Sequence, residues 1–375
     1  MKKLFALLLA LVMVFALVAC GAEKAPVEEA PVVEAPVEEA PVEEAPAAEL
    51  YIPVMAKGFQ HQFWQAVAKG SEDAAADLGV KIYFDGPASE TEIAAQVDMV
   101  KKEMAKNPQA LALAALSTEA VTEILEECAE KGIPVVGFDS GVPGDTTGAV
   151  VATACTNNEA AAALAAEKFG ENDALIEAMT NATAEEPIMI ACLSQDAVSA
   201  SVTGRTTGFV NKMVEVASQY GTVSVEGHSL WENKVADASI IIRVEVSATT
   251  EATALQTSSA ALLANENLKA VFCSNEGAVT GFLAAVSDGE DLAEGGKYDG
   301  LVVAGFDAGA AQKNAVRQGW FYGSVTQDPY QIGYQAVALA VAAANGEEVA
   351  DVDTGAQWYN AENIDDEMIA LLVYD

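Results

Sequence analysis

Two aspartates stand in nearly identical local sequences. Asp139 ends the run Gly-Phe-Asp within IPVVGFDSGV (133–142), and Asp307 ends the same run within LVVAGFDAGA (301–310). Each follows an apolar stretch typical of a buried strand, and ligands of open parallel sheets bind at the carboxyl ends of such strands. The pair could hydrogen-bond one ligand, act as the acid and base of a hydrolase, or cap two unrelated helices.

Strands and helices alternate from residue 50 onward, and this alternation must position the two aspartates. Amphipathic stretches at 62–78, 92–106 and 119–131 predict helices, and Ser117-Thr118 supplies a capping signal for the third. Apolar runs that predict buried strands occur at 50–55, 80–84, 110–116, 133–138, 188–193, 269–274 and 301–306. Strands that are apolar throughout predict parallel sheets covered on both faces. We therefore predict an α/β fold with two doubly wound lobes.

One segment does not fit this alternation. The strand-like run at 240–246 interrupts the region 232–268, where a single helix is expected. The run is compatible with an added hairpin or with an irregular helix.

Charge and motif content exclude several classes of function. The 375 residues carry a formal net charge of −37, which repels polyanions and excludes nucleic-acid binding as a main activity. His61 and His228 lack partners at metal-ligand spacing, and no phosphate-binding loop of the Walker type is present. We expect no metal, no cofactor and no enzyme activity, because no substrate-cleaving motif accompanies the two aspartates.

The first twenty residues have the layout of an export signal. Lys2 and Lys3 precede a 16-residue apolar run from Leu4 to Ala19, which is short for a membrane span. The ending Leu-Val-Ala-Cys at 17–20 resembles the lipobox of bacterial lipoproteins, in which the cysteine is lipidated. A plain signal peptide with an incidental Cys20 is the alternative.

Residues 21–49 repeat Ala-Pro-Val-Glu-Glu with a proline at every fifth position. Such prolines prevent helix formation and favour an extended polyproline conformation. We expect a disordered linker that tethers the folded body to a membrane. A low-complexity segment without a role is the alternative.

From about Tyr51 onward the chain resembles the type I periplasmic binding proteins, specifically the ribose-binding-protein-like group that serves sugar ABC transporters. The resemblance rests on residues 57–64, the two Gly-Phe-Asp runs, the helix start at 203–209, FCSNEG at 272–277 and VTQDP at 325–329. It implies two lobes joined by three crossover segments. The first would be 50–155 plus 328–356, and the second 156–327 plus 357–375.

The resemblance also implies a sugar-binding site between the lobes. Phe63 and Trp64 match the stacking aromatics, although either could instead pack in the core. Arg205 could instead form a structural ion pair, and Gln327 could serve only as a hinge hydrogen bond. The implied ligand contacts are Lys57, His61, Phe63, Trp64, Asp139, Arg205, Trp231, Asn275, Asp307 and Gln327. Thr203 replaces an arginine of the ribose-binding members, so ribose itself is disfavoured.

These features together predict an extracytoplasmic solute-binding lipoprotein, anchored on the outer face of the cell membrane. It would be a monomer that passes a monosaccharide-like ligand to an ABC permease and its ATPase. A surface sensor that presents its ligand to a receptor kinase or chemotaxis protein is the main alternative, and a glycoside hydrolase is a remote one. Regulators of the lac-repressor type share the fold, but the export signal argues against that use.

Overall fold

The computed structural model describes residues 50–59 and 61–374. The predicted export signal, the lipidation at Cys20 and the Pro/Glu-rich linker lie outside these residues. Within the described part of the chain, no helix is long and apolar enough to cross a membrane.

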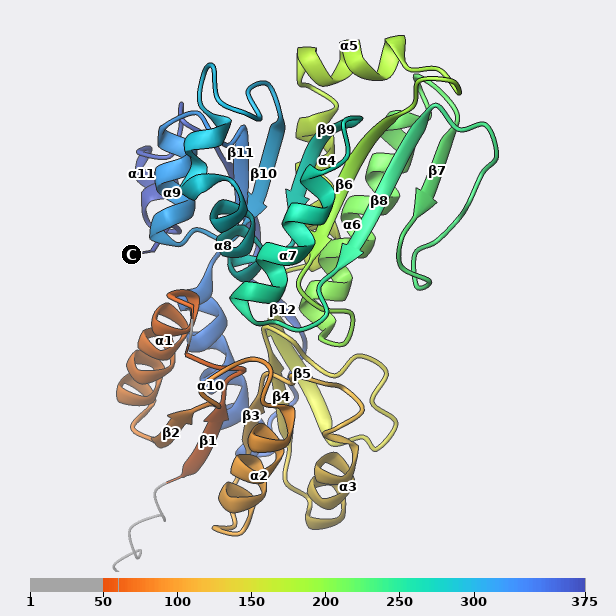
Figure 1. The fold of residues 1–375 in the computed structure, drawn as a ribbon. Coiled ribbons are helices and arrows are strands. Elements are labelled where there is room, and N and C mark those ends of the chain that lie inside the picture. Colours follow the sequence, from red (N-terminus) through yellow and green to blue (C-terminus); the bar gives the residue numbers. More distant parts are fainter. Residues whose placement is uncertain (1–49, 60, 375) are drawn as a thin grey trace, which may run out of the picture. The chain divides into compact units, whose positions relative to one another are not determined.

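The first lobe is built on a six-stranded parallel sheet in the order β12-β5-β4-β3-β1-β2. Its strands are β1 (Tyr51–Met55), β2 (Lys81–Asp85), β3 (Leu111–Leu113), β4 (Val135–Phe138), β5 (Val150–Cys155) and β12 (Val352–Asp353). Helices α1 (Phe63–Leu78) and α10 (Pro329–Ala344) cover one face, and α2 (Ile93–Met104) and α3 (Thr122–Lys131) cover the other (Figure 1). An apolar core therefore lies on each side of the sheet.

The second lobe is built on a seven-stranded sheet in the order β13-β11-β10-β9-β6-β8-β7. Its strands are β6 (Ile188–Ser194), β7 (Val223–Glu226), β8 (Ile240–Val246), β9 (Leu268–Cys273), β10 (Val302–Phe306), β11 (Gly323–Gln327) and β13 (Ala356–Tyr359). One core includes residues of α4 (Asn158–Phe169), α5 (Asp173–Asn181) and α6 (Ala200–Ala217). The other includes residues of α7 (Ala252–Leu263), α8 (Glu276–Ala285), the short 3-10 helix η1 (Ser287–Leu292), α9 (Ala310–Arg317) and α11 (Glu367–Ala370). All described strand pairs are parallel except β11 with β13.

The predicted α/β architecture is confirmed, with three local differences. The run 240–246 is neither a hairpin nor a helix, because it forms the parallel strand β8 between β6 and β7. Helix α3 begins at Thr122 without a side-chain cap, and Ser117 instead accepts a hydrogen bond from Ala120 in the preceding turn. Strand β2 is half exposed because it forms the edge of its sheet.

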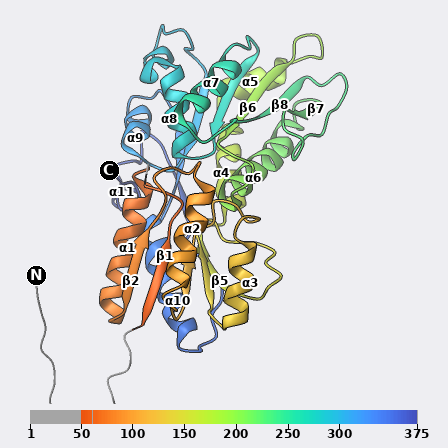
Figure 2. The same ribbon diagram turned by 60° about the horizontal axis from the view of Figure 1, so that its bottom comes forward.

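The chain passes between the two sheets at three places. These are the link from β5 to α4, the link from β11 to α10, and the link from β12 to β13. The first and third links are joined to each other, because Thr156 Oγ1 donates to the Gly355 carbonyl at 3.0 Å. Figure 2 shows α10 on the first sheet beside α1, although these two helices are far apart in the sequence.

Both lobes use glycine to bring two helices into close contact. A Cβ atom at Gly333 of α10 would lie 2.0 Å from the Val67 carbonyl oxygen of α1. A Cβ atom at Gly208 of α6 would lie 2.1 Å from the Glu159 carbonyl oxygen of α4. Since real side chains do not approach so closely, α1 with α10 and α4 with α6 pack through these positions.

Candidate ligand-binding site between the lobes

The two Gly-Phe-Asp aspartates occupy equivalent positions, one in each lobe. Asp139 directly follows β4 and Asp307 directly follows β10, each at the carboxyl end of its strand. Both have a positive φ, 51° for Asp139 and 79° for Asp307, which turns the chain sharply at the sheet edge. Neither residue is the N-cap of a described helix, because Asn275 and Gly309 hold that position before α8 and α9.

In the first lobe, Lys57 neutralises Asp139. Its Nζ lies 3.0 Å from Asp139 Oδ2, and both side chains are almost fully buried. Burial acts to lower the pKa of Lys57, but the negative charges of Asp139 and Glu90 outweigh it and leave the pKa raised. The ammonium group also donates to Ser140 Oγ and to Ser201 Oγ of the second lobe, at 3.2 and 3.1 Å. Lys57 therefore carries a buried positive charge between the lobes.

The two aromatic residues at the start of α1 border the site and also pack in the core. Phe63 and Trp64 are 5% and 1% exposed, and their ring centroids are 5.0 Å apart in an edge-to-face arrangement. Phe138, the middle residue of the first Gly-Phe-Asp run, supports Trp64 at 6.4 Å. The Trp64 indole donates to Glu90 Oε1 at 3.0 Å. Both rings therefore pack in the core and also line the cavity between the lobes.

In the second lobe, Arg205 is held over the other Gly-Phe-Asp run. Its guanidinium carbon lies 3.9 Å from the ring centroid of Phe306. Nε donates to Asn158 Oδ1 at 2.8 Å, and Nη1 donates to Asp307 Oδ2 at 3.4 Å. Nη2 reaches Asp139 Oδ1 of the first lobe at 4.0 Å. Arg205 therefore forms a structural ion pair and also faces both aspartates.

Asp307 has a complete set of donors from its own lobe. Gln327 Nε2 donates to its Oδ1 at 2.6 Å, and the Glu276 amide donates to its Oδ2 at 3.0 Å. Asn275 caps α8 through a hydrogen bond from the Ala278 amide at 3.0 Å, so its side-chain oxygen is occupied. Gln327 Oε1, in contrast, is buried and accepts no hydrogen bond from the described residues.

These side chains meet around one small cavity. It is lined by Lys57, His61, Phe63, Trp64, Glu90, Asp139, Val202, Arg205, Asn275, Glu276, Asp307 and Gln327. Nine of the ten predicted ligand contacts are in this set. The cavity has a volume of about 20 Å³, close to the space that one water molecule requires. A sugar ring therefore enters only if the lobes move apart.

The structure adds two acidic residues that the sequence analysis missed. Glu90 follows β2 and accepts a hydrogen bond from Gln195 Nε2 of the second lobe at 2.8 Å. Burial acts to raise the pKa of Glu90, but Lys57, His61 and the hydrogen bonds from Trp64 and Gln195 lower it overall. The second missed acidic residue is Glu276, the first residue of α8, which lines the same cavity. Burial raises the pKa of Glu276.

Trp231 lies apart from the nine other predicted contacts. Its indole donates to Thr207 Oγ1 at 2.9 Å, and its ring packs against the second-lobe core and against His228. It does not line the cavity between the lobes. In the region that follows Trp231, residues 240–246 form strand β8, and the one helix expected there is α7.

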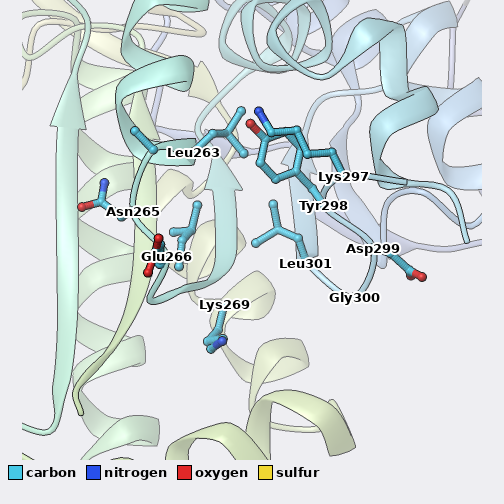
Figure 3. Close-up of a pocket in the computed structure, with 11 residues that line it drawn as sticks. Leu263, Asn265, Glu266, Lys269, Lys297, Tyr298, Asp299, Gly300 and Leu301 are labelled. Carbon is cyan, nitrogen blue, oxygen red and sulfur yellow. The ribbon is translucent and has the colours of Figure 1, made fainter. Parts of the chain in front are cut away.

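A larger hollow occurs at a different place in the second lobe. It has a volume of about 410 Å³ and is lined by residues around Leu263 and Leu301, with Lys297 stacked over Tyr298 at 4.8 Å (Figure 3). It contains none of the predicted contacts, and its residues come from one lobe only.

The two-lobed fold and the buried polar side chains around the central cavity are typical of the class of proteins that hold a ligand between two lobes.

The chain belongs to the periplasmic binding protein family, whose domain model matches residues 52–348. It is 25% identical over 319 residues to the D-allose-binding periplasmic protein of Escherichia coli (strain K12), covering 83% of this chain and 90% of that protein.

Two solved structures are also similar. One is described as an ABC transporter, LacI family transcriptional regulator, from Brachyspira murdochii (40% identity, TM-score 0.73, 88% of this chain and 99% of that one). The other is a carbohydrate transporter solute-binding protein from Agrobacterium radiobacter in complex with D-arabinose. It is 27% identical with a TM-score of 0.70, and the match covers 87% of this chain and 99% of that one. The predicted family resemblance is confirmed, and these relatives are described as binding and transport proteins, not enzymes.

Proposed function

We propose that the protein captures a monosaccharide or a closely similar polyol between its lobes and delivers it to an ABC permease. The observation that carries this proposal is the convergence of Asp139, Arg205 and Asp307 on one cavity with Phe63 and Trp64 at its wall. Carboxylates and a guanidinium hydrogen-bond adjacent hydroxyls, and aromatic rings suit the apolar C–H faces of a pyranose. The ligands in the descriptions of the relatives support the same class.

Capture requires no chemical step. With the lobes apart, a sugar reaches Arg205 and Asp307 of the second lobe and the aromatic wall of the first. Hydrogen bonds made by both lobes to one ligand exist only when the lobes are together, so the ligand favours closure. The links between the lobes, near Thr156, Asp328 and Thr354, would act as the hinge.

A hydrolase is disfavoured by the same contacts. A glycosidase needs one carboxyl group that stays protonated, typically in an apolar setting. Here Asp139 lies 3.0 Å from the Lys57 ammonium group, and Asp307 lies 3.4 Å from the Arg205 guanidinium. Neither carboxyl group therefore lies in the apolar setting that a general acid requires.

The proposal extends to the location of the protein. Export and lipidation at Cys20 would anchor it on the outer face of the cell membrane, and residues 21–49 would give the lobes reach. Metabolic labelling with a fatty-acid analogue should label the wild-type protein and not a Cys20→Ala variant. Equal labelling of both would contradict the anchor.

Calorimetric titration with D-allose, D-arabinose, D-ribose, D-glucose and D-galactose tests the proposal. We expect at least one of these sugars to bind with micromolar affinity or better, which corresponds to about 8 kcal/mol. Adenosine and a free amino acid serve as non-sugar controls. Absence of binding by every sugar, with folded protein confirmed by circular dichroism, would overturn the proposal.

A further inference from the structure

A second hollow adjoins the central cavity and lies between the same two lobes. It has a volume of about 310 Å³ and is bounded by the loop after β2, by the loops after β6 and β8, and by Leu116 of the first lobe. Lys57 and Glu90 line both this hollow and the central cavity. The two spaces therefore share a wall, so a ligand in the central cavity would lie next to the adjoining space.

The side chains of this hollow differ from those of the central cavity. Its apolar wall consists of aliphatic side chains, namely Ile93 and Leu116 from the first lobe and Val198 and Val246 from the second. None of the described residues that line it is aromatic, and it contains no arginine. The hollow thus lacks the stacking rings and planar donors that suit a second sugar ring.

The wall of the hollow also contains polar residues, among them Gln195, Asp196 and Thr250. Gln195 is fully buried, and its Oε1 accepts no hydrogen bond from the described residues. Thr250 Oγ1 is also buried without a hydrogen-bond partner there. The Asp196 carboxylate is occupied, because it accepts hydrogen bonds from the amides of Val198 and Ser199. Unpartnered buried oxygens are costly unless a ligand or water supplies a donor.

We infer that the ligand is a glycoside with an apolar substituent, whose sugar ring occupies the central cavity and whose alkyl or aryl group occupies the hollow lined by Leu116, Val198 and Val246. This inference rests on the proposed function, which it makes more specific. The aliphatic wall provides the contact surface, and the volume of about 310 Å³ admits a group of several carbons. Closure of the lobes would cover the substituent from both sides.

The inference is tested by calorimetry with the methyl, propyl and pentyl glycosides of D-allose and D-arabinose. Each glycoside is titrated in both anomeric forms. Full burial of one methylene group strengthens binding about fourfold, so propyl should bind about 15-fold more tightly than methyl in at least one series. The free sugars are titrated in parallel.

A variant pair assigns the gain to this hollow. Val198 is 52% exposed at its edge, so Val198→Asp should fold normally and should remove most of the gain while leaving the affinity for the methyl glycoside within about twofold. Val235, 39% exposed and outside the hollow, gives the matched control Val235→Asp, which should retain the gain.

The possible outcomes separate the inference from the proposed function. Equal affinities for the methyl and propyl glycosides overturn the inference, and so does binding of the free sugars without binding of any glycoside. A chain-length gain that Val198→Asp does not reduce also overturns it. Absence of binding by free sugars and glycosides alike overturns the proposed function together with the inference.

Discussion

The two lobes place the same Gly-Phe-Asp run at the same sheet edge but use it differently. In the second lobe Asp307 receives donors from Gln327, Glu276 and Arg205, all of its own lobe. In the first lobe Asp139 Oδ2 accepts no hydrogen bond from the described residues and lies only in ion-pair contact with Lys57. The second lobe therefore holds its aspartate with several directed hydrogen bonds, whereas the first holds its aspartate by the charge of Lys57, which also donates to Ser201 of the second lobe.

The phenylalanines of the two runs show the same division. Phe306 lies under the Arg205 guanidinium, so it positions a charged donor. Phe138 packs against Trp64, so it positions an apolar wall. The run of the second lobe thus positions a hydrogen-bond donor, and the run of the first lobe supports an apolar ring at the wall of the cavity. The following predictions test this division, beginning with the largest expected effect.

Replacing Lys57 with Met should separate the two lobes without unfolding either of them. The variant removes the buried positive charge that acts on both Asp139 and Glu90, and an uncompensated buried charge costs about 3–5 kcal/mol. Separation of the lobes hydrates both carboxylates and avoids this cost. Small-angle X-ray scattering should therefore give a larger radius of gyration for the variant.

Lys69→Met is the matched control, because Lys69 pairs with Asp73 on the exposed surface of α1. An unchanged radius of gyration for Lys57→Met would contradict a role of Lys57 in holding the lobes together.

Replacing Asp307 with Ala should weaken sugar binding at least tenfold, while the scattering profile stays unchanged. A hydrogen bond to a charged group contributes roughly 1.5–3 kcal/mol, and the change also removes the acceptor that fixes Arg205. Calorimetry measures the affinity, with Asp365→Ala, an exposed partner of Arg317, as the control. Wild-type affinity in Asp307→Ala would remove Asp307 from the site.

Replacing Gly208 with Ala should destabilise the second lobe by about 1–3 kcal/mol, the usual cost of overpacking. The new Cβ would lie 2.1 Å from the Glu159 carbonyl oxygen, so α4 and α6 must separate. Gly204→Ala on the same helix is the matched control, since its Cβ would meet side-chain atoms alone, Asn158 Cβ at 3.2 Å and Glu159 Cγ at 4.0 Å. Chemical denaturation measures both, and equal stabilities would contradict the close packing.

Glu90 should make a smaller, pH-dependent contribution to stability. Its pKa is lowered from the ordinary value of 4.5, so the folded state binds this proton more weakly than the unfolded state. The corresponding stability is present above pH 4.5 and is lost as the pH falls through the folded-state pKa. Glu90→Gln should therefore lose stability less steeply on acidification than the wild type.

Denaturation at several values between pH 3 and pH 6 measures this slope, with Glu119→Gln on the exposed surface as the control. Parallel curves for wild type and Glu90→Gln would contradict the assignment.

The sequence predicted the fold and the placement of the two aspartates because both follow from local patterns. Apolar runs flanked by helices define the parallel sheets, and the repeated Gly-Phe-Asp run marks an equivalent edge in each lobe. Strand β8 was harder to place, because an extended apolar run does not specify its neighbours. Only pairing with β6 and β7 distinguishes a central strand from a hairpin.

The sequence did not reveal the contacts that cross between the lobes. Glu90 lies in a polar loop with no distinguishing pattern, and its partner Gln195 is 105 residues away. Ser201, which receives a hydrogen bond from Lys57, is 144 residues from it. Such pairs depend on how the lobes meet, which no local pattern encodes.

The path of the chain has a consequence for biosynthesis. Helix α10 and strand β12 complete the first sheet, and strand β13 completes the second, so both lobes need segments from beyond residue 328. A growing polypeptide cannot finish either lobe until the residues after 328, about one-eighth of the 375, have left the ribosome. The protein therefore remains incompletely folded for most of its synthesis.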